Sequence, residues 1–242
     1  EAHTKSDALN LAKLLGAQDL GVSTIDLNMN GQLIENQLPE GSIQGKLNGF
    51  EYKGHRYNAI TIDATRKNST INGVVNIADE LANLGFDGTF NERNSQITGK
   101  LHVNNLSPHT LNLTDGLEDQ SFNMDADIDM QGKSLNTLLG SIDINELRVT
   151  DKENSVSVDH INVNISQEGV DKTIDIHSDF ADAHLQGRIE PEGIIDAFKN
   201  QLAGHLPSLL HHKKENHNQF AFDVTLTTSE FLKHFIDIKY TS

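Results

Sequence analysis

Alternation of apolar and polar residues dominates this chain. From Ser121 to Gln131 the sequence reads S-F-N-M-D-A-D-I-D-M-Q. Successive side chains of a β-strand point to opposite faces, so this segment would place apolar residues on one face and acidic residues on the other. Similar two-residue periods recur along most of the chain. They predict an all-β protein, an elongated and curled antiparallel sheet with an apolar interior and a few short helices.

The first half of the chain predicts a series of β-hairpins. A short entry helix is expected over residues 6–20, because leucines fall at helical spacing and Gly21 suits its end. Asn30-Gly31 and Lys53-Gly54 predict turns. Strands are expected near residues 25–29, 43–47, 57–64, 69–77, 84–90 and 97–103. An apolar-x-Gly-x-apolar motif recurs around Gly45, Gly73, Gly99 and Gly187. These are either ordinary strand glycines or positions that help a sheet to curl.

The second half predicts an up-and-down meander that ends in a helix. One helical turn is expected at 134–140, and strands are expected at 142–149, 156–165, 174–180 and 183–189. An amphipathic helix is expected at 191–210, and a terminal strand and short helix within 219–242. We interpret residues 1–242 as a single fragment of a longer repeating protein. Its β-repeat part spans 1–115 and its β-meander 116–190.

Composition excludes several classes of function. The chain has 19 Lys and Arg against 35 Asp and Glu, a net charge of −16, which argues against nucleic acid as a partner. It has no cysteine, so disulfides and thiolate metal sites are excluded. No apolar run is long enough to cross a bilayer. Aromatic residues are 5% and tryptophan is absent, which disfavours a sugar-binding platform.

No motif for catalysis or metal binding is complete, so we expect neither an enzyme nor a cofactor. Asp125, Asp127 and Asp129 resemble the start of a calcium loop, but Met130 and Asn136 occupy the positions where an EF-hand needs Gly and Glu. A solvated strand face is the simpler interpretation. Three histidines fall in one polar loop, at His211, His212 and His217. A solvated loop explains them better than a metal site.

A family resemblance is carried by residues 132–210. They read G-K-S-L-N-T-L-L-G-S-I-D-I-N-E-L-R-V, then N-S-V-S-V-D-H-I-N-V-N-I-S, then K-T-I-D-I-H-S-D-F-A-D-A-H-L-Q-G-R-I, and end with H-L-P-S-L-L. This stretch resembles the TamB-type translocation and assembly module proteins of the AsmA-like group, in the form seen in Bacteroidetes-type bacteria. Residues 9–31 resemble the helix-then-strand entry of the same family. The shared motifs are β-repeats without a catalytic signature. The first hundred residues share only the general β-repeat pattern with the family.

The resemblance implies a long periplasmic protein that is anchored to the inner membrane by an N-terminal helix. In that family the sheet curls lengthwise into a taco-shaped trough with an apolar interior. Such proteins are linked to phospholipid movement between the two envelope membranes and to outer-membrane protein assembly. The chain is then expected to be a middle piece of the trough, without the anchor, with phospholipid acyl chains and outer-membrane assembly machinery as partners.

The apolar face allows three hypotheses about function. The pattern alone is typical of a closed β-sandwich, a structural or adhesin-like spacer whose apolar face is packed. The resemblance favours an open groove for lipid tails. A third hypothesis is a scaffold that offers strand edges to outer-membrane clients. Some groove residues are expected to pack under the helix at 191–210. The candidate groove lining comprises Phe122, Met124, Ile128, Met130, Ile142, Ile144, Leu147, Val149, Val156, Val158, Ile161, Val163, Ile165, Ile174 and Ile176.

Overall fold

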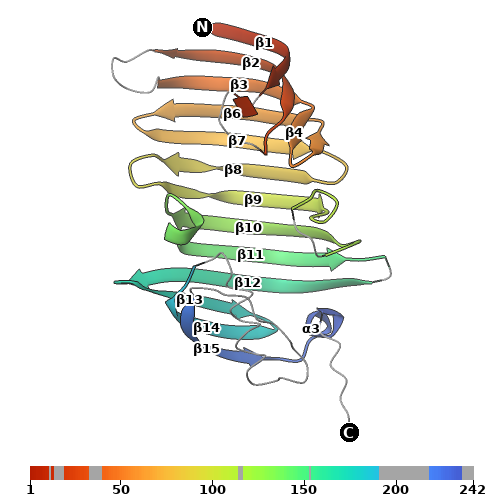
Figure 1. The fold of residues 1–242 in the computed structure, drawn as a ribbon, viewed down its shortest axis with the longest axis vertical. Coiled ribbons are helices and arrows are strands. Elements are labelled where there is room, and N and C mark those ends of the chain that lie inside the picture. The colour runs from red at the N-terminus through yellow and green to blue at the C-terminus, as the bar shows by residue number, and fades with distance from the viewer. Residues whose placement is uncertain are drawn as a thin grey trace.

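One long antiparallel sheet forms most of the molecule. The structure, a computed structural model, describes residues 1–10, 12–13, 19–32, 40–113, 117–152, 154–190 and 218–235. These residues are nearly all β, as the alternation predicted. Thirteen strands pair in one open sheet, and two short strands form a separate hairpin. Figure 1 shows the strands stacked like rungs along the long axis, from the N-terminal strand at one end to the last strand at the other.

The strands follow one another in the sheet in chain order. Those of the first half are β1 (Ala2–Asn10), β2 (Val22–Gln32), β3 (Glu40–Asn48), β6 (Ile60–Lys67), β7 (Thr70–Ala78), β8 (Asn83–Asn91) and β9 (Gln96–Leu106). The separate hairpin consists of β4 (Phe50–Tyr52) and β5 (His55–Tyr57), so that β3 pairs directly with β6. Those of the second half are β10 (Ser121–Gln131), β11 (Leu139–Thr150), β12 (Ser155–Glu168), β13 (Asp171–Ser178), β14 (Ala181–Arg188) and β15 (Gln219–Leu226). Two short helical elements are η1 (Leu135–Thr137) and α3 (Glu230–Phe235).

The predicted entry helix at 6–20 is wrong for its first residues. Ser6 pairs with Ile25, and Leu9 pairs with Ser23, so the chain is extended up to the end of β1. Of the described residues between 11 and 20, only Ala12 and Lys13 are helical. The edge of β2 offers a row of backbone donors and acceptors, and pairing with them outweighs the weak helical preference of a short segment.

The predicted turn at Asn30-Gly31 is also wrong. Both residues lie inside β2, where Asn30 pairs with Ser42 and Gly31 pairs with Gly41. A Cβ on Gly31 would lie 2.6 Å from the carbonyl oxygen of Glu40. The glycine therefore serves a close approach of two strand backbones rather than a reversal of the chain.

Several other local predictions are confirmed. Lys53 and Gly54 form the turn between β4 and β5, with positive φ angles of 48° and 80°. The predicted helical turn at 134–140 contains η1, and the expected terminal strand and helix correspond to β15 and α3. The strand expected at 57–64 is instead divided, because β5 ends at Tyr57 and β6 begins at Ile60. The amphipathic helix expected at 191–210 lies outside the described residues.

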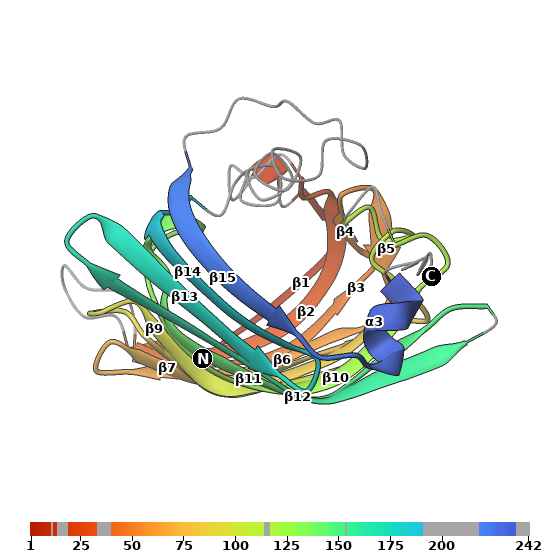
Figure 2. The same ribbon diagram turned by 90° about the horizontal axis from the view of Figure 1, so that it is seen from below.

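The sheet is curled into a trough. Figure 2, a view from below along the sheet, shows a concave side on which the β4–β5 hairpin and α3 lie. The hairpin residue Tyr57 packs in one cluster with Ile60 of the sheet, and Ile62, Val75 and Ile77 pack against that cluster. The concave face is therefore the apolar face, and the acidic positions of the strands form the convex face.

A bulge lets the apolar pattern change phase where β10, β11 and β12 meet. The register of β10 against β11 shifts between Asn123 and Asp125. Glu146 on β11 has a positive φ of 52°. An extra residue of this kind explains why Ile144 and Leu147 are both apolar although three positions separate them.

Candidate functional site

The candidate groove residues all lie in β10, β11, β12 and β13. They form cross-strand rows on the concave face, such as the row in which Ile128 pairs with Ile142, Ile142 with Val163, and Val163 with Ile176. Twelve of the fifteen are half-buried, so their side chains lie on a surface that is partly open. The other three are buried: Met130 is 4% exposed, Val149 0% and Val158 3%.

The same rows continue beyond the predicted set. On one side, Ala126 pairs with Leu101, which pairs with Phe86. On the other side, Ile174 pairs with Leu185, which pairs with Phe222 on the last strand. The sequence prediction stopped at Ile176, although the same alternation is present in the neighbouring strands. The apolar face thus crosses the whole sheet from β2 to β15.

Three glycines form a bare stripe across the middle of this face. Gly73 pairs with Gly88, and Gly88 pairs with Gly99, so three neighbouring strands lack a side chain at the same level. A Cβ on Gly88 would come within 2.5 Å of the Cζ atom of Phe86, and a Cβ on Gly99 within 2.8 Å of the same atom. The ring of Phe86 therefore occupies the space that side chains at Gly88 and Gly99 would need.

One rim of the trough is closed by a small second layer. Ala82 and Leu111 are fully buried there, together with Tyr57 of the hairpin and Ile60 of the sheet. Phe50 and Tyr52 of the hairpin, Leu81 of the β7–β8 loop and Leu106 at the end of β9 are among the side chains that pack against this cluster. The helix α3 also packs on the concave side, where the ring of Phe231 lies 4.8 Å from the ring of Phe180. At this rim the apolar face thus has the two-layer packing of a β-sandwich core.

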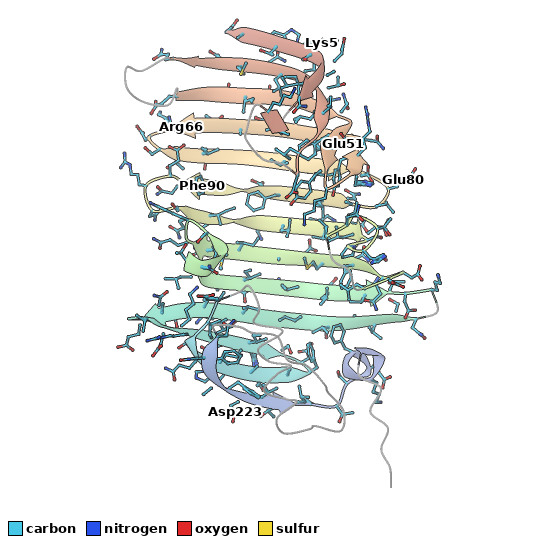
Figure 3. All side chains as sticks on the ribbon, viewed as in Figure 1. Lys5, Glu51, Arg66, Glu80, Phe90 and Asp223 are labelled. Carbon is cyan, nitrogen blue, oxygen red and sulfur yellow. The ribbon has the colours of Figure 1, made fainter. Side chains whose placement is uncertain are left out.

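The opposite rim has no such second layer among the described residues of β2 to β9, and we call it the open rim. At its other end, near β13 to β15, Lys172, Ile189 and Phe220 are buried. Figure 3 labels Arg66 and Phe90 at this rim and Glu51 at the rim that carries the hairpin. A hollow of about 470 Å³ opens beside Arg66, and its apolar lining includes Met29 and Ile43. Phe90 is 38% exposed although it points to the apolar face. Apolar side chains at this end of the rim, Met29 and Phe90, therefore remain partly in contact with solvent.

Arg66 is a charged residue at a position where the alternation predicts an apolar one. It pairs with Ile71 across the sheet and follows Ile62 and Ala64 in phase. Its guanidinium donates two hydrogen bonds to the carboxylate of Glu92, at 2.9 Å from Nε and 2.7 Å from Nη2. These bonds raise the pKa of Arg66 and lower the pKa of Glu92, because each stabilises the charged form of its partner.

A second cation, Lys172, breaks the alternation on β13. It precedes Ile174 and Ile176 in phase, yet only 6% of it is exposed. Its Nζ atom donates a hydrogen bond to the backbone oxygen of Asn136 in η1, at 2.6 Å. Burial lowers the pKa of Lys172, because removing an ammonium group from water disfavours its charged form. Sequence reasoning missed both cations, since it sought groove residues only among apolar positions.

The convex face is polar and contains many ion pairs between neighbouring strands. The acidic residues that resemble a calcium loop lie there, and Asp125 binds His102 at 2.6 Å while Asp127 binds Lys100 at 3.3 Å. Asp129 accepts a hydrogen bond from Gln96 at 2.7 Å. Similar imidazole–carboxylate pairs are formed by His3 with Asp26, His177 with Asp182, and His184 with Asp175. In the described part of the chain, no group of three or more His, Asp or Glu side chains could hold a metal ion.

The described part of the candidate site is an apolar surface with two cations, Arg66 and Lys172, on one side. Among the described residues no helix is long and apolar enough to span a membrane. The three histidines of the polar loop lie outside the described residues. Comparisons of the chain with protein-family models, with curated protein sequences and with solved structures found no match.

Proposed function

We propose that this chain is a segment of a periplasmic, bridge-like protein that carries phospholipid between the inner and outer membranes. One observation carries the proposal, a concave apolar face that crosses the sheet from β2 to β15 and whose side chains are mostly half-buried and not fully buried. The family resemblance of residues 132–210 supports the same function and extends it to a role in outer-membrane protein assembly.

The dimensions of the trough suit lipid tails. Thirteen strands stack along its axis, and at about 4.8 Å between neighbours they span roughly 58 Å. One leaflet of a bilayer is about 15 Å thick, so several lipids could lie one behind another along this length. The strands run across the trough, so a tail moving along it would pass one apolar row after another.

The energetics favour tight binding with easy sliding. Each CH₂ group that leaves water contributes about 0.8 kcal/mol, so a long acyl chain gains on the order of 10 kcal/mol. Rows of aliphatic side chains repeat along the trough, so a tail exchanges one apolar environment for an equivalent one as it moves. Dispersion and hydrophobic contact have no preferred direction, which lets such a surface conduct lipid without chemistry.

Lipid extraction of the purified protein, followed by mass spectrometry, tests the proposal. A matched pair of variants on β12 sharpens it, because Val163 faces the trough and its neighbour Asn164 is exposed on the convex face. We expect Val163→Asp to lose bound phospholipid and Asn164→Asp to retain it. Protein that carries no phospholipid, and moves none between vesicles, would contradict the proposal and favour the spacer.

A further inference from the structure

A buried cation on the trough side of β13 has no acidic partner. Lys172 is more than nine-tenths buried, and its one described bond joins Nζ to the backbone oxygen of Asn136. No carboxylate of the described residues lies within ion-pair distance of its ammonium group. Lysine is almost never fully buried unless it is paired, because an uncompensated charge in a low-dielectric environment is costly. The ammonium also keeps donors that a carbonyl alone does not use.

The position of Lys172 in the sheet places it on the same side of the trough as the open rim, at the end where Ile189 and Phe220 are also buried. A single cross-strand row begins at Arg66 and runs through Ile71, Phe90, Ile97, Met130, Gly140 and Ile165 to Ile174. Lys172 lies two residues beyond Ile174, so it is one step closer to the rim than this row. Its partner on β14 is Gly187, where a Cβ would lie 2.7 Å from the Cα atom of Phe220 on β15.

The open rim is thus the cationic side of the trough. Arg66 already binds Glu92, whereas Lys172 has no counter-charge among the described residues. At the opposite rim the β4–β5 hairpin covers the sheet with apolar side chains. A lipid in the trough has an anionic phosphate at one end and apolar tails at the other. Charge complementarity therefore favours the orientation in which the phosphate lies at the rim with Lys172 and the tails lie on the apolar rows.

We propose that Lys172 binds the phosphate of a phospholipid headgroup, with the headgroup at the open rim and the tails on the apolar rows of the trough. This inference rests on the proposed function, and it adds which chemical group of the lipid is recognised and by which residue. Without lipid, the ammonium folds back onto the carbonyl oxygen of Asn136. With lipid, a phosphate oxygen accepts a charge-assisted hydrogen bond from the same Nζ atom.

A competition between two lipids of identical acyl chains tests this site. Delipidated protein is mixed with vesicles that contain equal amounts of phosphatidylglycerol and diacylglycerol, and the bound lipids are measured by mass spectrometry. A hydrogen bond to a charged group contributes about 1.5–3 kcal/mol, so the wild type should prefer the phospholipid at least about tenfold. Lys172→Met should bind both lipids equally, while its binding of diacylglycerol stays unchanged.

Control variants separate the site from general effects. Lys100→Met removes an exposed cation on the convex face and should keep the preference. Lys172→Arg keeps the charge and should keep most of the preference as well. Because the buried ammonium is unpaired, we expect Lys172→Met to melt at the same temperature as the wild type or higher. This outcome would show that any lost preference does not come from misfolding.

Each other outcome overturns a specific claim. A tenfold preference that persists in Lys172→Met would overturn the proposed site and leave lipid transport intact. A wild type that binds neither lipid would overturn the proposed function itself. If inorganic phosphate raises the melting temperature of the wild type but not of Lys172→Met, and no phospholipid preference exists, the residue binds a free anion and the headgroup assignment is wrong.

Discussion

Replacement of Ile128 by aspartate tests whether this side chain lies on the floor of an open trough or in a closed hydrophobic core. Ile128 lies at the middle of β10, with Gly99 on one neighbouring strand and Ile142 on the other. Its side chain is half-buried, so part of it is in contact with solvent. A carboxylate at this position could remain hydrated as long as the trough contains no lipid.

The magnitude follows from the exposure of the site. Complete burial of an isoleucine side chain contributes about 3 kcal/mol, and half-burial reduces the loss in Ile128→Asp to about 2 kcal/mol. For a chain of this size that corresponds to a fall in melting temperature of about 4–8 °C. Val158 is only 3% exposed, so Val158→Asp also buries an unpaired charge and should cost roughly 4 kcal/mol or more.

The two variants should therefore differ in which property they lose, the bound lipid in Ile128→Asp and the folded state in Val158→Asp. We expect Ile128→Asp to fold and to lose its bound phospholipid, because a charge among acyl chains is strongly unfavourable. We expect Val158→Asp to lose folded protein altogether. The reasoning is refuted if Ile128→Asp unfolds as readily as Val158→Asp, or if it melts several degrees lower yet keeps its full lipid content.

Three further variants test separate parts of the fold. The hydrogen bonds from Arg66 depress the pKa of Glu92 below its ordinary value of 4.5, so they stabilise the fold above pH 4.5 and cease to do so as the pH falls through the depressed pKa. Glu92→Gln should accordingly be less stable than the wild type to urea at pH 7, and the difference should vanish in acid. Gly88→Ala would push a methyl group into the ring of Phe86 and should lower stability by about 1–3 kcal/mol in urea titrations. Glu146→Gly should raise the melting temperature, because it relieves a positive φ at an exposed position by about 1 kcal/mol.

Much of the fold could be predicted because the alternation acts locally and repeats. A segment such as 121–131 specifies its own two faces, and each neighbouring segment repeats the pattern, so a single sheet with one apolar face follows. The signals that failed were those in which a distant partner decides the outcome. Asn30-Gly31 has the sequence of a hairpin turn, but pairing with β3 keeps it extended.

The shape of the candidate site depended on contacts that no local pattern contains. Leu111 is far from Tyr57 in the sequence, yet both are buried in the cluster that closes one rim. Lys172 resembles an ordinary polar strand end until its burial beside η1 is known. The sequence pattern indicates which residues face the trough, whereas exposure and charge pairing at its rims depend on loops and turns that arrive from elsewhere in the chain.

The described residues cover the apolar face of the sheet at one rim only, which raises the question of what covers the rest. Cross-strand pairs such as Ile142 with Val163 stabilise the sheet, but each contributes only about 0.2–1 kcal/mol. An ordinary sandwich gains more by burying this face against another sheet. In this chain the described second layer covers one rim only, so the remaining apolar area gains the same burial whenever tails occupy the trough. A ligand that binds only the folded state stabilises it in proportion to the logarithm of its concentration, and bound lipid would thus be both the cargo and part of the core.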